Sequence, residues 1–372
     1  MAKKNQNKSP IQTVVVPFLS ALLGLVVGVL GSISYSLINV QTDEKSKNNK
    51  IGEVFQDFQI HFLELGNIYA GDSIYIKANN VDILIDAGSR TSSKETIKNY
   101  LSEYVNANKL EYVIATHAHQ DHIAAFGCKE GIFYSYDIDN IIDFPLTNSE
   151  TKTYTSYLEG RDYAVEKGAN HYTALECYKN ENGAKSTYEF GNNMSMQILY
   201  TSFYEEETKD ENDYSVCVLF KYGSNKFLLT GDLEEDGEKS LVEHHSDDIK
   251  DCDLFKAGHH GSYTASTKEL LSVVKPSYSV VTCVCGSIEY TKNTANTFPS
   301  QNYINNISEY TDNVYVTSLC TDYESGEFQS MNGNVIISSN GSDIALSCSN
   351  NNTKLKDTDW FKTNRECPEN WK

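Results

Sequence analysis

The most continuous hydrophobic pattern in the chain lies near its N-terminus. Val14–Ile33 belongs to a stretch without a charged residue, and its length matches the roughly 20 residues that a helix needs to cross a bilayer. Its proline and glycines are poor in soluble helices but are tolerated in membrane-spanning ones. The run is longer than the ~7–15-residue core of a signal peptide, and no A-x-A cleavage site follows. We therefore expect one transmembrane helix in a lipid membrane, with a cleaved signal peptide as the alternative.

The charges around this segment predict how the chain is divided and oriented. Lysines flank it on both sides, and those that precede it favour an N-terminus in the cytoplasm. We expect residues 1–10 to form a cytoplasmic tail, residues 11–40 a transmembrane anchor and residues 41–52 a polar linker. The rest of the chain is then expected on the extracytoplasmic side of the cell membrane, attached by a single pass.

After the linker, short β-type runs alternate with stretches of helical periodicity. The expected strands are Phe58–Leu63, Ser73–Lys77, Val81–Ile85, Glu111–Ala115, Ser215–Tyr222, Lys226–Leu229, Asp253–Ala257, Tyr278–Cys283, Val314–Val316, Val335–Ile337 and Ile344–Leu346. The expected helices are Lys94–Val105, Glu235–His244 and Ser266–Val274. Two β-rich halves with helices between them predict an α/β fold in which two sheets pack face to face under helices. We expect one domain over residues 53–349 and a tail over residues 350–372.

The segment Tyr134–Phe190 interrupts this alternation. It is rich in tyrosine and less periodic than the rest of the chain, so we expect an insertion or a lid. Tyrosine rings can bind a choline-like cation through cation–π contacts. Packing and loop positions explain these tyrosines more simply, and we take that as the first interpretation.

Charge limits the partners that the chain can bind. The formal net charge is −20, and the first 50 residues hold six lysines against two acidic residues, so the remainder carries −24. A surface that acidic repels polyanions over about 8–10 Å. Long nucleic acid is therefore an unfavourable partner unless bound metal ions supply positive charge.

Candidate chemistry begins where an apolar strand ends in a cluster of polar residues. Tyr112–Thr116 is followed by His117, His119, Asp121 and His122. Alternation at a strand end points the first two histidines the same way, and the other two residues fall on a loop or the first turn of a helix. Imidazole and carboxylate groups are the ligands that Zn²⁺ prefers. Four of them exceed one tetrahedral site with an open position, so we expect two metal ions about 3.5–4 Å apart.

Three further strand ends carry residues of the same kinds. Asp86 follows the run Ile83–Ile85, and Asp232 follows a strand that ends in Thr-Gly. His259 and His260 lie in a Gly-His-His-Gly turn after another apolar run. Each of these features alone is common in structural positions, but together with the first cluster they indicate one metal centre.

This series of motifs, in this order along the chain, resembles the metallo-β-lactamase superfamily. In particular it is similar to the hydrolase domain attached to ComEC/Rec2-type competence proteins, and phosphorylcholine esterases of bacterial surfaces share a similar pattern. The likeness covers about Phe58 to Thr317 and includes the Gly71-Asp72-Ser73 run before a strand. It implies a four-layer αββα sandwich, which agrees with the pattern of strands and helices.

The resemblance also implies a role for each motif residue. His117 and His119 bind the first metal, Asp121 and His122 the second, Asp232 bridges the two, and His260 completes the second site. The metals are two divalent ions, Zn²⁺ first with Mn²⁺ as the alternative.

The remaining candidates are assigned by the same resemblance. His259 lies beside the metals as a phosphate contact or proton donor, although the sequence leaves open which of the adjacent histidines is the ligand. Asp86 orients a ligand histidine from behind. Many superfamily members have a further histidine between the first motif and the position of Asp232. Here only His171 lies in that interval, without a motif around it, and we expect a structural role for it with metal binding as the alternative.

The expected function is a membrane-anchored, binuclear metal-dependent hydrolase. The resemblance favours phosphodiester hydrolysis of a small or exposed substrate, with a metal-bridging hydroxide as nucleophile, Asp121 as proton acceptor and His259 as the second catalytic residue. The alternatives are a lactam, lactone or thioester hydrolase of the same fold, and a tethered binding protein with a vestigial site. Intact residues at every motif argue against the last of these.

The hydrophobic run supports a direct test of anchoring. A segment of this length inserts through apolar burial and not through charge, so the full-length protein should stay in the membrane fraction after a high-salt wash. Release of a mature protein that begins near residue 34 would instead identify Val14–Ile33 as a cleaved signal peptide.

Overall fold

A computed structural model describes residues 50–372 of the chain. The predicted anchor, with its hydrophobic run Val14–Ile33, lies outside these residues. Within residues 50–372, no helix has both the length and the apolar character needed to cross a membrane. The structure therefore addresses the body of the protein only.

The body is built from two mixed β-sheets. The first sheet has the strand order β1-β17-β16-β2-β3-β4-β5-β6-β7, with bounds Lys50–Ile51, Ile344–Cys348, Val335–Ser339, Phe58–Phe62, Ile74–Ala78, Val81–Ile85, Lys109–Ile114, Asp137–Asp143 and Asn170–Thr173. The second has the order β15-β14-β13-β12-β11-β10-β9-β8, with bounds Glu327–Ser330, Val314–Asp322, Tyr278–Cys285, Leu254–Lys256, Asn225–Leu229, Cys217–Tyr222, Met194–Leu199 and Thr187–Gly191.

Alternation along the strands of the second sheet assigns its two faces. On β10, Val218 and Phe220 pack in the core shared with the first sheet, whereas Leu219 packs in a second core. β11 repeats the pattern, with Phe227 in the first core and Leu228 in the second. Because side chains alternate with a period of two, one face of this sheet meets the other sheet and the opposite face is free for helices.

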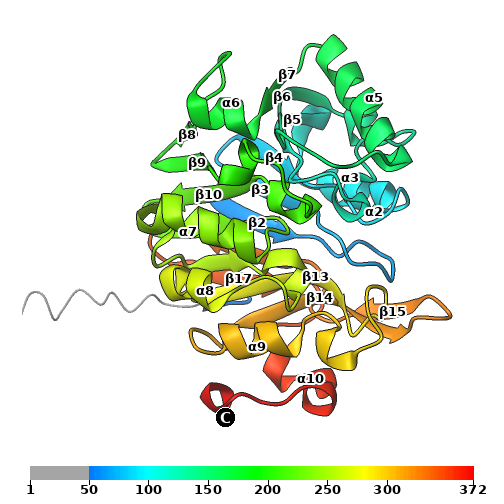
Figure 1. Ribbon diagram of the computed structural model, residues 1–372, viewed down its shortest axis with the longest axis vertical. Helices are drawn as coiled ribbons and strands as arrows, with labels where there is room; N and C mark the ends of the chain where they lie inside the picture. The colour runs from blue at the N-terminus through cyan, green and yellow to red at the C-terminus, as the bar shows by residue number, and fades with distance from the viewer. Residues whose placement is uncertain (1–49) are drawn as a thin grey trace, which may run out of the picture. The chain divides into compact units, whose positions relative to one another are not determined.

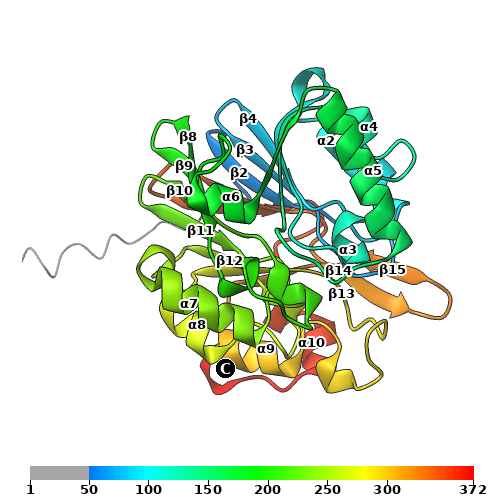
Figure 2. The ribbon, with the colours of Figure 1, turned by 45° about the horizontal axis from the view of Figure 1, so that its top comes forward.

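Helices cover both outer faces, as Figures 1 and 2 show. α2 and α5 contribute to the core of the first sheet, and α7, α8, α9 and α10 contribute to the second core. The predicted sandwich of two sheets covered by helices is confirmed. The helices are α2 (Ser93–Leu101), α3 (Gln120–Ile123), α4 (Ile132–Ser135), α5 (Lys152–Glu166), α6 (Ala174–Lys179), α7 (Glu235–Ile249), α8 (Lys268–Val274), α9 (Gln301–Ile307) and α10 (Asp359–Asn364).

The interpretation of Tyr134–Phe190 as an insertion or lid is wrong. This segment supplies β6 and β7 to the first sheet and most of β8 to the second. β6 runs parallel to β5, and Ile138, Ile141 and Ile142 are buried. Its other residues are aspartate and asparagine, which are depleted in strands. Residue propensities therefore do not predict this strand.

The last residues of the chain are packed into the body. Leu355, Phe361 and Trp371 are buried in the second core, and Trp371 Nε1 donates a hydrogen bond of 2.9 Å to the carbonyl oxygen of Thr311. Residues 350–372 therefore act as a structural segment and not as a free tail. At the other end, β1 pairs in parallel with β17 where the sequence predicted the end of a linker.

Removing the Trp371 ring should therefore destabilise the fold. We expect Trp371→Ala to lower the free energy of unfolding by about 3–5 kcal/mol, because it leaves a cavity and strips a hydrogen-bond donor. Denaturant unfolding of the body measures this. Val165→Ala, at a position that is 40% exposed, is the control and should change stability by less than about 0.5 kcal/mol. Equal effects of the two substitutions would contradict a structural role for the C-terminal segment.

Candidate metal centre

Four strand ends converge at one edge of the sandwich. β4 and β5 run parallel in the first sheet, and β11 and β12 run parallel in the second, so the carboxyl ends of each pair lie together. Asp86 follows β4, His117 lies three residues after β5, and Asp232 lies three residues after β11. His260 follows β12 in the turn η4 (Gly258–Gly261). All four side chains are buried, so the sheets bring distant parts of the sequence into one cluster.

The tightest part of this cluster contains Asp121, His122, Asp232 and His260. One candidate ligand atom from each lies within 4.8 Å of the others. Asp232 Oδ2 lies 3.0 Å from His122 Nε2 and 3.1 Å from His260 Nε2. Asp121 Oδ2 lies 3.4 Å from His260 Nε2. Asp121 and His122 occupy the first turn of α3, directly after His119.

Groups behind the cluster set the orientation of its imidazoles. Asp86 Oδ2 lies 2.7 Å from His122 Nδ1, and the carbonyl oxygen of Thr282 accepts a hydrogen bond of 2.8 Å from His260 Nδ1. With Nδ1 engaged in each ring, Nε2 faces Asp232. This is the arrangement by which outer groups fix the tautomer of a metal-binding histidine.

His117 and His119 lie beside this cluster as a pair. His117 Nε2 is 3.0 Å from His119 Nδ1, and the ring centroid of His117 is 4.2 Å from that of His122. Burial lowers the pKa of His117 well below its usual value, and the neighbouring His122 and His119 lower it further. A neutral imidazole with a free lone pair is the form that binds metal.

The two histidines of the turn η4 point in different directions. His260 is fully buried and faces Asp232, whereas the side chain of His259 is 19% exposed. His259 Nδ1 lies 2.6 Å from Glu234 Oε1, which also accepts a hydrogen bond from the Thr264 hydroxyl. Both histidines have positive φ angles, 43° and 54°, a conformation that non-glycine residues seldom adopt. The geometry therefore favours His260 over His259 as the ligand.

The charges of the cluster call for additional positive charge. Burial by itself raises the pKa of Asp232, yet His122, His260 and Lys256 hold it well below its usual value. Burial lowers the pKa of His260, but Asp232 and Asp72 raise it well above 6.5. His260 Nε2 makes no hydrogen bond of suitable geometry, although a carboxylate oxygen is 3.1 Å away. The donor set of imidazole nitrogens and carboxylate oxygens fits a divalent ion such as Zn²⁺ or Mn²⁺.

Known proteins match the part of the chain that includes His117, His119, Asp121 and His122. The profile described as the metallo-beta-lactamase superfamily matches residues 66–127. Recombination protein 2 of Haemophilus influenzae is 26% identical over 226 residues, which cover 60% of this chain and 24% of that protein. ComE operon protein 3 of Bacillus subtilis is 25% identical over 242 residues, 60% of this chain and 28% of that protein. These matches support the resemblance of the chain to the metallo-β-lactamase superfamily.

Two further comparisons cover a shorter part of the chain or a solved structure. Competence protein ComA of Neisseria gonorrhoeae is 36% identical over 76 residues, 20% of this chain and 11% of that protein. The solved structure of YhfI from Bacillus subtilis, a metallo-β-lactamase fold protein, is 13% identical with a TM-score of 0.40, and covers 74% of this chain and all of its own. This chain spans about a quarter of the length of the first two curated relatives.

His171 lies away from the metal centre. It is on β7, and its Nε2 lies 2.8 Å from Asp143 Oδ1. Arg161 and the Tyr157 hydroxyl contact the same carboxylate. This shared carboxylate supports the structural interpretation of His171.

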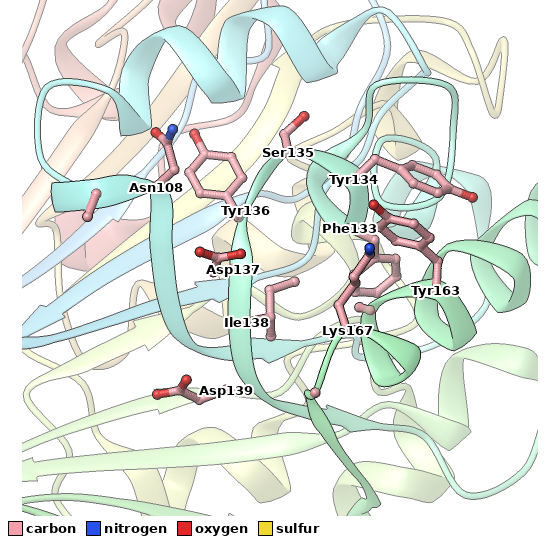
Figure 3. A pocket seen from close by; sticks show the side chains of 13 residues that line it. Asn108, Phe133, Tyr134, Ser135, Tyr136, Asp137, Ile138, Asp139, Tyr163 and Lys167 are labelled. Carbon is pink, nitrogen blue, oxygen red and sulfur yellow. The ribbon is translucent and has the colours of Figure 1, made fainter.

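The tyrosine-rich segment is also separate from the centre. Its tyrosines Tyr134, Tyr136 and Tyr163 line a cavity of about 690 Å³ together with Lys167 (Figure 3). This cavity lies at the start of β6, which is paired with the start of β5, whereas the metal centre lies beyond the end of β5. These tyrosines therefore cannot surround a substrate at the metal centre.

A smaller cavity adjoins the centre itself. It has a volume of about 310 Å³ and is lined by residues that include Glu234, His259, Tyr290 and Phe298. The Tyr290 hydroxyl donates a hydrogen bond of 2.8 Å to Asp121 Oδ2, which connects the cavity wall to the cluster. Tyr290 and Glu234 have no motif around them, and nothing in the sequence indicated either residue.

One further residue of the centre, Lys256, could have been recognised from the sequence. Lys256 is fully buried, and its Nζ lies 2.7 Å from Asp72 Oδ2 and 3.4 Å from Asp232 Oδ1. A lysine inside an apolar strand is rarely buried unless it is paired, and that exception could have identified it. Asp72 comes from the loop before β3, so the ion pair joins the two sheets.

Neutralising Lys256 should destabilise the metal-free protein. Lys256→Met leaves two buried carboxylates without their cation, and breaking such a pair costs about 3–5 kcal/mol. Denaturant unfolding in the presence of a chelator measures the loss. Adding Asp72→Asn should recover part of it, because the double variant removes both charges of the pair.

The matched control for this experiment is an exposed ion pair. Lys221 lies 3.3 Å from Asp248 with both side chains about one-third exposed, so Lys221→Met should cost less than about 1 kcal/mol. If Lys256→Met were no more harmful than Lys221→Met, the buried network would not stabilise the fold.

Proposed function

We propose that this metal-dependent hydrolase is a binuclear phosphodiesterase, anchored in a membrane by Val14–Ile33. The observation that carries the proposal is the placement of the histidine pair directly beside the four-residue cluster. Asp232 Oδ2 contacts two imidazoles of the cluster, and the His117 ring adjoins the His122 ring. Two ions held this close can clamp the attacking and the leaving oxygen of one phosphoryl group.

The ligand assignments follow from this placement. His117 and His119 would hold the first ion, and Asp121, His122 and His260 the second, with Asp232 shared between them. Divalent ions at such a site polarise a phosphoryl oxygen and make water acidic. Asp121 is ionised, because burial raises its pKa but His260 and His122 bring it below its usual range. As an ionised carboxylate it can bind a divalent ion and accept a hydrogen bond from the attacking water.

His259 is suited to the leaving group. Its Nδ1 is occupied by Glu234, which leaves Nε2 for a substrate in the adjoining cavity that this histidine lines. A histidine held by a carboxylate in this way is a common arrangement for a proton donor. We assign it the role of phosphate contact and proton donor to the departing oxygen.

One observation supports a phosphodiester as the bond that is cleaved, and two others limit the size of the substrate. One relative is named for recombination, a process that acts on a phosphodiester polymer. The cavity beside the cluster is only about 310 Å³, and the body carries a large negative charge. Non-specific binding of DNA depends on lysine and arginine contacts to phosphates, so we propose a small or exposed phosphodiester and not long duplex DNA.

An activated bis-aryl phosphodiester tests this proposal. The metal-loaded protein should hydrolyse it, and Asp121→Asn should reduce turnover by ~100-fold or more, since outer groups alone affect activity by 10–100-fold. Tyr315→Phe is the control, because the Tyr315 hydroxyl is buried in the body and has no hydrogen-bond partner, so its removal should leave turnover unchanged.

Three outcomes would contradict the proposal in different ways. Rapid degradation of duplex DNA at physiological salt would overturn the limit on substrate size. Hydrolysis of a lactam, lactone or thioester without any phosphodiesterase activity would assign the same site to a different reaction. A protein that binds metal but hydrolyses none of these substrates would favour a binding role.

A further inference from the structure

The first metal site, at His117 and His119, has few histidine, cysteine, aspartate or glutamate ligands. Two groups of histidine, cysteine and acidic side chains in residues 50–372 are close enough to hold an ion, and neither includes His117 or His119. Two imidazoles and the shared Asp232 are a minimal ligand set, since sites of this kind generally have at least three protein ligands. A further protein ligand of this ion must be of another residue type.

Asn212 has a free ligand atom in a buried position. Its side chain is only 6% exposed, and Oδ1 has no hydrogen-bond partner. Nδ2 donates a hydrogen bond of 3.1 Å to Glu234 Oε1. Because an ionised carboxylate only accepts hydrogen bonds, this contact fixes which end of the amide is nitrogen. The atom without a partner is therefore the carbonyl oxygen, and leaving it so costs about 1–3 kcal/mol.

Asn212 belongs to a turn whose two ends contact the segment of the histidine pair. It lies in the turn η3 (Glu211–Tyr214), which is held against the strand end that carries the pair. Glu211 Oε1 accepts a hydrogen bond of 3.3 Å from the amide of Ala118, between the two histidines. At the other end of the turn, Ser215 Oγ lies 3.4 Å from His117 Nδ1.

Contacts on the opposite side confine the same residue. Ser215 Oγ also accepts a hydrogen bond from the amide of Asp232, and Glu234, the partner of Asn212, binds His259. The turn neighbours of Asn212 thus contact the histidine pair and the amide of Asp232, and its own partner Glu234 contacts His259. Because Oδ1 is buried, it cannot form its missing hydrogen bond with bulk solvent.

We infer that Asn212 Oδ1 is a further protein ligand of the first metal, together with His117, His119 and the shared Asp232. The inference rests on the proposed binuclear centre, which the sequence could not complete with a histidine. An amide oxygen is a harder donor than imidazole, so this ligand set favours Mn²⁺ more than three imidazoles would. The proposal also gives the unpaired oxygen a partner.

Metal binding by Asn212→Leu tests the inference. Leucine has a similar volume but no donor atom, so the variant should bind about one equivalent of Mn²⁺ or Zn²⁺ where the unaltered protein binds two. Equilibrium dialysis with elemental analysis gives the count. His119→Ala should lose the same equivalent, and Tyr315→Phe, which also removes a buried oxygen without a partner, should retain both.

Unfolding of the metal-free and metal-loaded forms separates this role from a structural one. Without metal, Asn212→Leu should change stability little, because removal of the unsatisfied oxygen offsets the loss of the hydrogen bond from Nδ2 to Glu234. With metal, its gain in melting temperature should be smaller. If leucine prevents folding, Asn212→Ala provides the same test with a smaller side chain.

The results distinguish the inference from the proposed function. If the unaltered protein binds only one equivalent, the binuclear centre itself is wrong. If it binds two equivalents and both Asn212 variants also bind two with unchanged affinity, the centre stands and Asn212 is not a ligand. Loss of both equivalents in a folded Asn212 variant would likewise overturn a role limited to the first site.

Discussion

Carboxylates buried between the ends of two sheets are the constraint on which the rest of this structure depends. Asp72, Asp86, Asp121 and Asp232 are almost fully removed from solvent, and burying a charge without a partner is strongly unfavourable. Among the described residues, Lys256 is the fully buried lysine that contacts two of these carboxylates. One fixed cation against four carboxylates leaves a deficit, which protonated histidines reduce in the metal-free state and divalent ions can remove.

The same charges connect the site to the packing of the sheets. Lys256 belongs to β12 of the second sheet, whereas Asp72 precedes β3 of the first. The ion pair between them therefore forms only when the sheets are packed face to face. Asp72 also accepts a hydrogen bond from Thr282 on β13. Folding of the sandwich and assembly of the centre are in this sense one event, and a change at the centre should affect stability as well as chemistry.

The turn η4 decides which groups meet the centre and which meet a substrate. Two successive left-handed residues make the side chains of His259 and His260 diverge, although they are neighbours in sequence. His260 is held by the Thr282 carbonyl and faces the carboxylates. His259 is held by Glu234, which also binds Asn212 and Thr264. Glu234 thus ties the cavity side of the centre to the turn that carries Asn212.

The sequence by itself determined the elements and the ligand types, because both follow from local patterns. Apolar runs predicted most strands, and polar residues directly after them predicted the cluster. It failed at β6, where the residues other than the buried isoleucines are aspartate and asparagine, and at Trp371, whose burial depends on the distant Thr311. Only the tertiary structure decided the direction of His259 and His260, the pairing of Lys256 with Asp72, and the burial of Asn212 Oδ1. Each of these depends on contacts between segments far apart in the chain, and no local pattern records which segments will meet.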